Sequence, residues 1–310
     1  MATGLNYLPK PFTNDAPCRD AVEAALAYDS AGQDYFTYAD GRADSLFEFT
    51  GQYDYADQLV WRQIDAALLA LHAQGRRRIR ILDAGCGPGT WLIRAATRAR
   101  QLGFEHVEAE GFDISPEMIR LARENAAFRG DCRFTTGDLI EPIGQETDAV
   151  DLTLCLYGVV NHLPAETHAA VAAELARVTS GYLFVTARAV GSLPTIFVGS
   201  MASARSFSQD NRTDRFEVGL MNGTYLSFTA HLFSAAELKG LFDPHVPEAD
   251  LLGLDVFHSR FATDRRWNPE SLPYSTAFEQ ELCRLEERCA ADPVFIDRAA
   301  HILLRADCSR

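Results

Sequence analysis

Apolar and polar positions alternate between two periodicities through the middle of the chain. Short segments bounded by glycine or acidic residues predict strands over residues 79–82, 107–112, 133–136, 150–157 and 181–186, and the apolar runs at 79–82 and 150–157 predict buried ones. Apolar residues spaced three to four positions apart predict amphipathic helices over residues 90–102, 115–128 and 164–178. Strands and helices that alternate in this way predict a parallel sheet built from right-handed crossovers.

Two helices and an aromatic cluster precede this alternating region. An alanine-rich helix is expected over residues 21–28, and a longer one over residues 56–74, which Gly75 ends. The aromatic residues between them, among them Tyr35, Tyr38 and Tyr53, have two readings. They pack a helical cap onto the sheet, or they form a lid whose tyrosines cover bound ligands.

The pattern changes beyond Arg188. Residues 191–214 are rich in Ser, Gly, Asn and Arg and predict a loop. Two alternating runs, 216–220 and 224–228, flank Asn222-Gly223, and Asn-Gly between such runs is a strong hairpin signal. The remaining periodic segments predict helices over residues 234–242 and 275–289 and strands over residues 251–257 and 301–304.

Composition narrows the class of protein. The 310 residues are 47% hydrophobic and 23% charged, as in an ordinary globular protein, and the formal net charge is −14. An acidic chain is a poor match for nucleic acid or an anionic membrane surface. The seven cysteines are scattered without C-x-x-C spacing, so zinc patterns and a disulfide framework are not expected. With no signal peptide or membrane span in the pattern, we expect a cytoplasmic protein.

The stretch from Ile79 to Trp91 carries the clearest chemistry. A predicted strand ends in Asp83-x-Gly85-x-Gly87-x-Gly89 and leads into a helix, an arrangement that lets backbone approach a ligand closely. The dinucleotide fingerprint would need glycine where Thr90 stands, and no lysine is present for a P-loop. The carboxylate of Asp83 would repel a diphosphate but suits a ligand with an amino group and a positive centre.

This stretch resembles motif I of the class I S-adenosylmethionine-dependent methyltransferases, and the resemblance extends over residues 79–188. It implies an α/β fold: a Rossmann-like, seven-stranded, mostly parallel sheet with helices on both faces, plus an N-terminal helical cap and a β-hairpin insertion. The expected division is a helical cap or lid (1–75), a cofactor-binding core (76–190), a loop and hairpin insertion (191–232) and the C-terminal part of the core sheet (233–310). The final two strands are expected to add an antiparallel pair.

The resemblance also implies a cofactor site for S-adenosyl-L-methionine, which becomes S-adenosyl-L-homocysteine. Asp83 and the Gly85, Cys86 and Gly87 backbone would hold the methionine part, and Asp113 would accept hydrogen bonds from the two ribose hydroxyls. The further cofactor-binding residues expected are Ile114 and Leu139 against adenine, Asp138 at its amino group, Leu156 at the end of the fourth strand, and Tyr38 from the lid. For Asp113 and Asp138 the alternative is a helix cap or turn residue.

Three residues are candidates for catalysis. His162 has a side chain suited to taking a proton near neutral pH, although a structural role is the alternative. Tyr157 closes the fourth strand at the edge where ligands of open α/β sheets bind. Arg188, with Asn161, could hold a carboxylate or phenolate substrate, or form a surface ion pair instead. No metal site is expected.

The expected activity is methyl transfer to a small organic acceptor by in-line displacement, mainly through alignment of donor and acceptor. The DNA amino-methyltransferase signature is absent after the fourth strand, where the chain has Leu156-Tyr-Gly-Val159. Two alternatives stay open: a non-methylating reaction of the same cofactor and a non-catalytic binding protein. A nicotinamide oxidoreductase is disfavoured by Thr90, and a homodimer is left open. No motif in the sequence identifies the methyl acceptor or the atom that is methylated.

Overall fold

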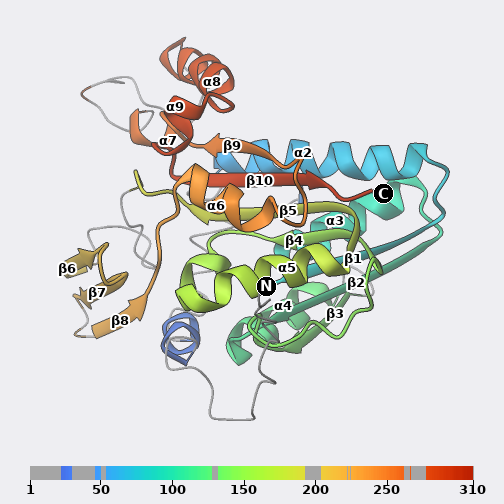
Figure 1. Ribbon diagram of the computed structural model, residues 1–310, viewed down its shortest axis with the longest axis horizontal. Coiled ribbons are helices and arrows are strands. Elements are labelled where there is room, and N and C mark those ends of the chain that lie inside the picture. The colour runs from blue at the N-terminus through green and yellow to red at the C-terminus, as the bar shows by residue number, and fades with distance from the viewer. Residues whose placement is uncertain are drawn as a thin grey trace, which may run out of the picture.

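A seven-stranded sheet forms the centre of the computed structural model, which describes residues 22–29, 46–49, 54–127, 132–192, 204–221, 223, 225–261, 266 and 277–309. The strands follow the order β3-β2-β1-β4-β5-β10-β9 (Figure 1). Their bounds are β1 Arg78–Ala84, β2 His106–Asp113, β3 Cys132–Thr136, β4 Val150–Cys155, β5 Thr179–Arg188, β9 Asp250–Leu254 and β10 His301–Asp307. The predicted Rossmann-like fold is confirmed.

The directions of the strands indicate at which edge of the sheet a ligand would bind. β1 pairs in parallel with both β2 and β4, and the parallel set extends to β3 and β5. β10 runs antiparallel between β5 and β9, so it alone opposes the others. Because the strand order reverses between β1 and β4, the carboxyl ends of these strands border a crevice.

Helices cover both faces of the sheet. One layer contains α2 (Asp54–Ala73), α3 (Thr90–Leu102) and α4 (Pro116–Ala126), and the other contains α5 (His168–Val178) and α6 (Ala235–Phe242). Successive strand residues point to opposite faces, so Ile81 packs in the core under the first layer and Leu82 in the core under the second. The long helix α2 therefore lies in the helical layer of the sheet, with Leu68 fully buried. The division of the chain at residue 75 stays a prediction.

A separate three-stranded antiparallel sheet lies beyond the carboxyl edge of the main sheet (Figure 1). It consists of β6 (Ala204–Asp210), β7 (Arg215–Leu220) and β8 (Tyr225–Thr229). The β7–β8 hairpin confirms the predicted one. The loop predicted over residues 191–214 is wrong for 204–210, because β6 pairs along β7 and Phe207 packs against Phe216 with ring centroids 6.3 Å apart. The polar composition of residues 204–210 gave no apolar pattern from which this edge strand could be predicted.

A helix over residues 22–29 packs on this three-stranded sheet. Ala27 shares a small core with Phe216 and Phe228, and Glu23 Oε2 lies 2.6 Å from Arg215 Nη1. The short helices α7 (His258–Phe261) and α9 (Pro293–Ile296) and the longer α8 (Ala277–Cys289) lie near the end of β9. Within the described part of the chain, no helix has the length and apolar character needed to cross a membrane.

Candidate active site

The glycine loop turns sharply between β1 and α3. Gly85, Gly87 and Gly89 have φ angles of 75°, 51° and 81°, values that L side chains rarely adopt. A Cβ on Gly85 would lie 2.4 Å from Val159 Cγ2, so close approach of the two segments also requires glycine there. The backbone N–H groups of Gly85 and Cys86 both donate to the Phe112 carbonyl, at 2.8 and 2.9 Å. These bonds fix the end of β1 against the end of β2.

Asp113 links this loop to the next one. Its Oδ2 accepts from Gly87 N at 2.9 Å, and its Oδ1 accepts from Ser115 N at 2.9 Å. Burial raises the pKa of Asp113 to about 6, against the lowering effect of these two N–H donors. Each carboxylate oxygen has a further lone pair, so Asp113 can still accept from a bound ligand. Asp113 therefore has the turn role that the sequence gave as the alternative, and its role as a ligand acceptor stays a prediction.

Asp83 lies beneath the loop and is almost fully buried, at 2% exposed. Burial, and then the charge of Asp113, raise the pKa of Asp83 to about 8. Its Oδ2 atom has no hydrogen-bond partner among the described residues. A buried carboxyl oxygen without a donor costs free energy, so this atom is a ready acceptor for a cationic group that enters the site.

A cavity of about 700 Å³, open to solvent, lies at this edge of the sheet. Its lining includes seven residues expected to bind cofactor, Gly85, Gly87, Asp113, Ile114, Asp138, Leu139 and Leu156, together with Tyr157 and His162. Asp83, Cys86 and Arg188 do not line it, and Tyr38 lies outside the described residues. The Cys86 side chain packs inward instead, where a Cβ on Gly111 would approach its own Cβ to 3.0 Å.

The cavity wall combines polar and apolar side chains, as the binding of an amphipathic ligand requires. Asp138 Oδ1 accepts from Ile140 N at 3.1 Å, which shapes the turn after β3, and burial raises the pKa of Asp138. The wall also includes residues that sequence reasoning did not name: Ala24, Tyr28, Phe112, Met118, Gly137, Val159 and Leu163. Phe112 and Gly137 directly precede Asp113 and Asp138, so the motifs could have predicted that they lie near the cavity. No motif in the sequence pointed to Tyr28.

Tyr28 and His162 form a hydrogen-bonded pair in the wall of the cavity. The Tyr28 hydroxyl lies 3.2 Å from His162 Nε2, and His162 Nδ1 lies 3.0 Å from the Thr229 carbonyl oxygen. Since a carbonyl only accepts, Nδ1 carries the proton and Nε2 presents a lone pair to Tyr28. Burial lowers the pKa of His162 to about 4, with the Arg188 charge adding to this effect. The imidazole is therefore neutral at physiological pH.

Tyr157 and Arg188, the other two catalytic candidates, form hydrogen bonds that stabilise the fold. Tyr157 has a φ of 57°, its N–H donates to Thr186 Oγ1, and its hydroxyl donates to the Asp57 carboxylate on α2. Arg188 N donates to Asn161 Oδ1 at 2.9 Å at the end of β5. Asn161 is fully buried and its amide also donates to the His231 carbonyl, so it fixes backbone rather than facing a substrate.

Comparison with known proteins decides the family. Residues 81–181, which contain the glycine loop, Asp113 and Asp138, match the family model of a methyltransferase domain. This region of the chain is a methyltransferase domain. The family assignment drawn from the sequence motifs is thereby confirmed.

The curated relatives of the methyltransferase domain match only in part. Ribosomal RNA large subunit methyltransferase E of Desulforapulum autotrophicum is 39% identical over 70 residues, which cover 23% of this chain and 32% of the relative. Magnesium-protoporphyrin O-methyltransferase of Rhodobacter capsulatus is 29% identical over 111 residues, which cover 33% and 46%. The chain thus matches less than half the length of either relative.

A solved structure shares the fold over nearly the whole chain. Magnesium protoporphyrin IX methyltransferase from Synechocystis PCC 6803, determined with bound SAH, has a TM-score of 0.50 and 17% sequence identity to this chain. The alignment covers 94% of this chain and 100% of that protein. At this level of identity the likeness is one of fold.

Proposed function

We propose that the chain binds S-adenosyl-L-methionine in the cavity at the carboxyl edge of the sheet and transfers its methyl group to a small organic acceptor. The observation that carries this proposal is the buried Oδ2 of Asp83, which has no hydrogen-bond partner among the described residues and lies beneath the glycine loop that lines the cavity. A cationic amino group satisfies that oxygen. When bound, the cofactor supplies a sulfonium-activated methyl group that an acceptor atom takes by displacement, leaving the thioether S-adenosyl-L-homocysteine.

The residues around the cavity fit the separate parts of this cofactor. Asp83 would hold the amino group, and Asp113 would accept from the ribose hydroxyls with the lone pairs that Gly87 and Ser115 leave unused. Ile114 and Leu139 provide apolar surface for adenine, and the half-buried Asp138 would accept from its amino group.

Tyr28 and His162 would handle the proton of the acceptor. As the new bond to carbon forms, the proton of an acceptor O–H or N–H becomes acidic and moves to the Tyr28 hydroxyl oxygen. The Tyr28 proton passes in turn to His162 Nε2, which lies 3.2 Å away. With a pKa of about 4, His162 is neutral and presents a lone pair at physiological pH, and it is a weaker base than the ordinary histidine that the sequence suggested.

The proposed acceptor is a small molecule rather than RNA. A formal net charge of −14 opposes the phosphate backbone, whose binding depends on clustered lysine and arginine. The match to the ribosomal RNA methyltransferase spans only 70 residues. The acceptor would approach from the side that the three-stranded sheet and helix 22–29 flank, since both lie beyond the carboxyl edge.

Calorimetric titration of the purified protein with S-adenosyl-L-methionine and S-adenosyl-L-homocysteine tests the proposal, with NAD⁺ as a control for the glycine loop. We expect binding of both sulfur compounds and none of NAD⁺. Small-molecule acceptors are then screened for a mass gain of one CH₂ together with formation of S-adenosyl-L-homocysteine. Failure of both sulfur compounds to bind would overturn the cofactor assignment. Product without S-adenosyl-L-homocysteine would replace methyl transfer by another reaction of the same cofactor.

A further inference from the structure

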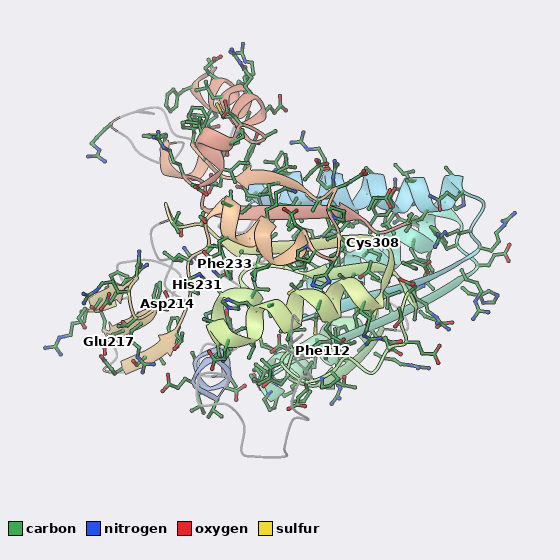
Figure 2. The ribbon with its side chains drawn as sticks, in the orientation of Figure 1. Phe112, Asp214, Glu217, His231, Phe233 and Cys308 are labelled. Carbon is green, nitrogen blue, oxygen red and sulfur yellow. The ribbon has the colours of Figure 1, made fainter. Side chains whose placement is uncertain are left out.

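The three-stranded sheet contacts the rest of the protein at a root formed by Asp214, before β7, and by Ala230 and His231, after β8. Ala230 N donates to the Asp214 carbonyl at 2.8 Å, and His231 N donates to the Asn161 carbonyl at 2.7 Å. Figure 2 shows His231 between Asp214, on the side of the three-stranded sheet, and Phe233, on the side of the main sheet. The root therefore touches the residue that precedes His162.

Both ring nitrogens of His231 face carboxylates. Nδ1 lies 2.8 Å from Asp214 Oδ2, and Nε2 lies 2.8 Å from Glu237 Oε1 on α6. A neutral imidazole has a single N–H and would set its other nitrogen, with a lone pair, against a carboxylate oxygen. Only the doubly protonated ring donates to both carboxylates, and hydrogen bonds between charged groups are the stronger kind.

We propose that His231, as a doubly protonated imidazolium, is the positioning residue that locks the three-stranded sheet to α6 and thereby fixes His162 in the cavity wall. Thr229, two residues before His231, supplies the carbonyl that His162 Nδ1 contacts at 3.0 Å. The catalytic consequence rests on the proposed function, whereas the lock itself is a property of the protein without ligand.

The same lock reaches Tyr28 through the three-stranded sheet. Arg215 on β7 forms an ion pair with Glu23 at 2.6 Å, and Phe216 and Phe228 pack against Ala27 of the helix that carries Tyr28. A shift of the root would therefore be passed to Tyr28 as well as to the Thr229 carbonyl. Asp29 anchors the other end of the same helix to α4, where Ser115 Oγ donates to Asp29 Oδ1 and Glu117 N donates to it at 3.3 Å.

The charges around His231 determine how the lock responds to pH. Burial lowers the pKa of His231, but the hydrogen bonds to Asp214 and Glu237 outweigh it and raise the pKa above the ordinary 6.5. Among the described residues, the further titratable neighbour is His168 on α5, with ring centroids 5.5 Å apart. Burial and the His231 charge lower the pKa of His168 below its ordinary value. The stabilisation is present below pH 6.5 and is lost as the pH rises through the raised pKa.

Imidazole NMR of the ligand-free protein tests the protonation directly. Long-range ¹H–¹⁵N spectra of His231 are expected to show both nitrogens protonated near pH 6.5. The titration midpoint should fall in Glu237→Gln, a mild change because that side chain is 43% exposed, and in Asp214→Asn. A ring with one protonated nitrogen at pH 6.5, or a midpoint that neither variant moves, would overturn the proposal.

Hydrogen exchange tests the mechanical role. Protection factors of the β7–β8 amides in the ligand-free protein should fall at least about tenfold in His231→Gln, the effect of losing one hydrogen bond to a charged group. In the wild type the same protection should fall with rising pH through the His231 midpoint, and His231→Arg, charged at all pH values, should retain it. The exposed His245→Gln is the matched control. Wild-type protection that is independent of pH would refute the lock even if cofactor binding and turnover proceed as proposed.

Discussion

The Tyr28 hydroxyl lies 3.2 Å from His162 Nε2 although 134 positions separate the two residues in the chain. Their rings meet edge to face, with centroids 5.6 Å apart and planes at 87°. His162 comes from the short 3₁₀ helix η1 (Val159–His162) after β4, and Tyr28 comes from a helix held on the three-stranded sheet. The two sides of the cavity wall are therefore joined by a bond that can carry a proton.

This pair predicts a selective loss of turnover. Tyr28→Phe removes the hydroxyl that bridges acceptor and imidazole, and His162→Gln removes the final proton acceptor. Each is expected to lower kcat about 10²-fold or more, the usual contribution of general base catalysis, while cofactor affinity stays within a factor of about three. The measurement is steady-state kinetics with an identified acceptor, beside calorimetric titration of cofactor.

Two further variants make this test sharper. The double variant should lose little more than either single one, because both act on one proton path. Tyr225→Phe, which changes a tyrosine 59% exposed near the tip of the three-stranded sheet, serves as the control and should keep wild-type turnover. Unaltered kcat in His162→Gln would remove His162 from the reaction and leave it a structural role.

Asp113 predicts a loss of affinity. Asp113→Ala removes the acceptor proposed for the ribose hydroxyls and also frees the N–H groups of Gly87 and Ser115. Cofactor affinity should fall at least tenfold, about 1.4 kcal/mol. Glu105→Ala, an exposed carboxylate just before the other end of β2, is the matched control for calorimetric titration. A dissociation constant equal to that of the wild type would exclude the ribose assignment.

The raised pKa of Asp83 predicts that cofactor binding releases a proton. With a pKa of about 8 in the free protein, Asp83 is largely protonated at pH 7, and a cationic amino group beside it favours the ionised form. Titrations in buffers of different ionisation enthalpy should report release of up to about one proton near pH 7. Asp83→Asn should abolish that release; a binding enthalpy independent of buffer in the wild type would contradict the assignment.

The same group has a predictable effect on stability. The pKa of Asp83 lies above its ordinary 3.8, so the folded protein holds this proton more tightly than the unfolded chain does. Its contribution to the free energy of unfolding therefore declines as the pH rises from about 4 to about 8. Asp83→Asn should make the ligand-free protein less sensitive to pH across that window in denaturant titrations.

We expect substitution by alanine to lower the free energy of unfolding by different amounts at Gly87 and at Gly85. Gly87→Ala meets no atom within 4 Å, so only its φ of 51° is unfavourable, at about 1 kcal/mol. Gly85→Ala adds a Cβ 2.4 Å from Val159 Cγ2, and overpacking of this kind costs about 1–3 kcal/mol more. Denaturant midpoints of the two variants test the difference, and equal midpoints would show that η1 yields without cost.

The fold was predictable where pattern and chemistry agree locally. The segments at residues 79–82 and 107–112 became β1 and β2 with small changes of boundary, since each lies between clear helix and turn signals. The strand predicted over residues 251–257 ends at Leu254, because Asp255 adopts a positive φ of 62°. The sequence did not predict β6. This edge strand is held by hydrogen bonds to β7, and its polar residues lack the apolar pattern that identifies a strand.

The sequence by itself determined the methyltransferase domain, the central sheet and many residues of the cavity wall, because Asp113 ends one strand and Asp138 follows the next, and parallel strands bring their carboxyl ends together. Only the tertiary structure decided which side chains act across that edge. It brought Tyr28 to His162, gave the Tyr157 hydroxyl to Asp57, and set His231 between two carboxylates. Contacts between distant segments depend on how the three-stranded sheet and α2 pack, and no local spacing in the chain encodes that packing.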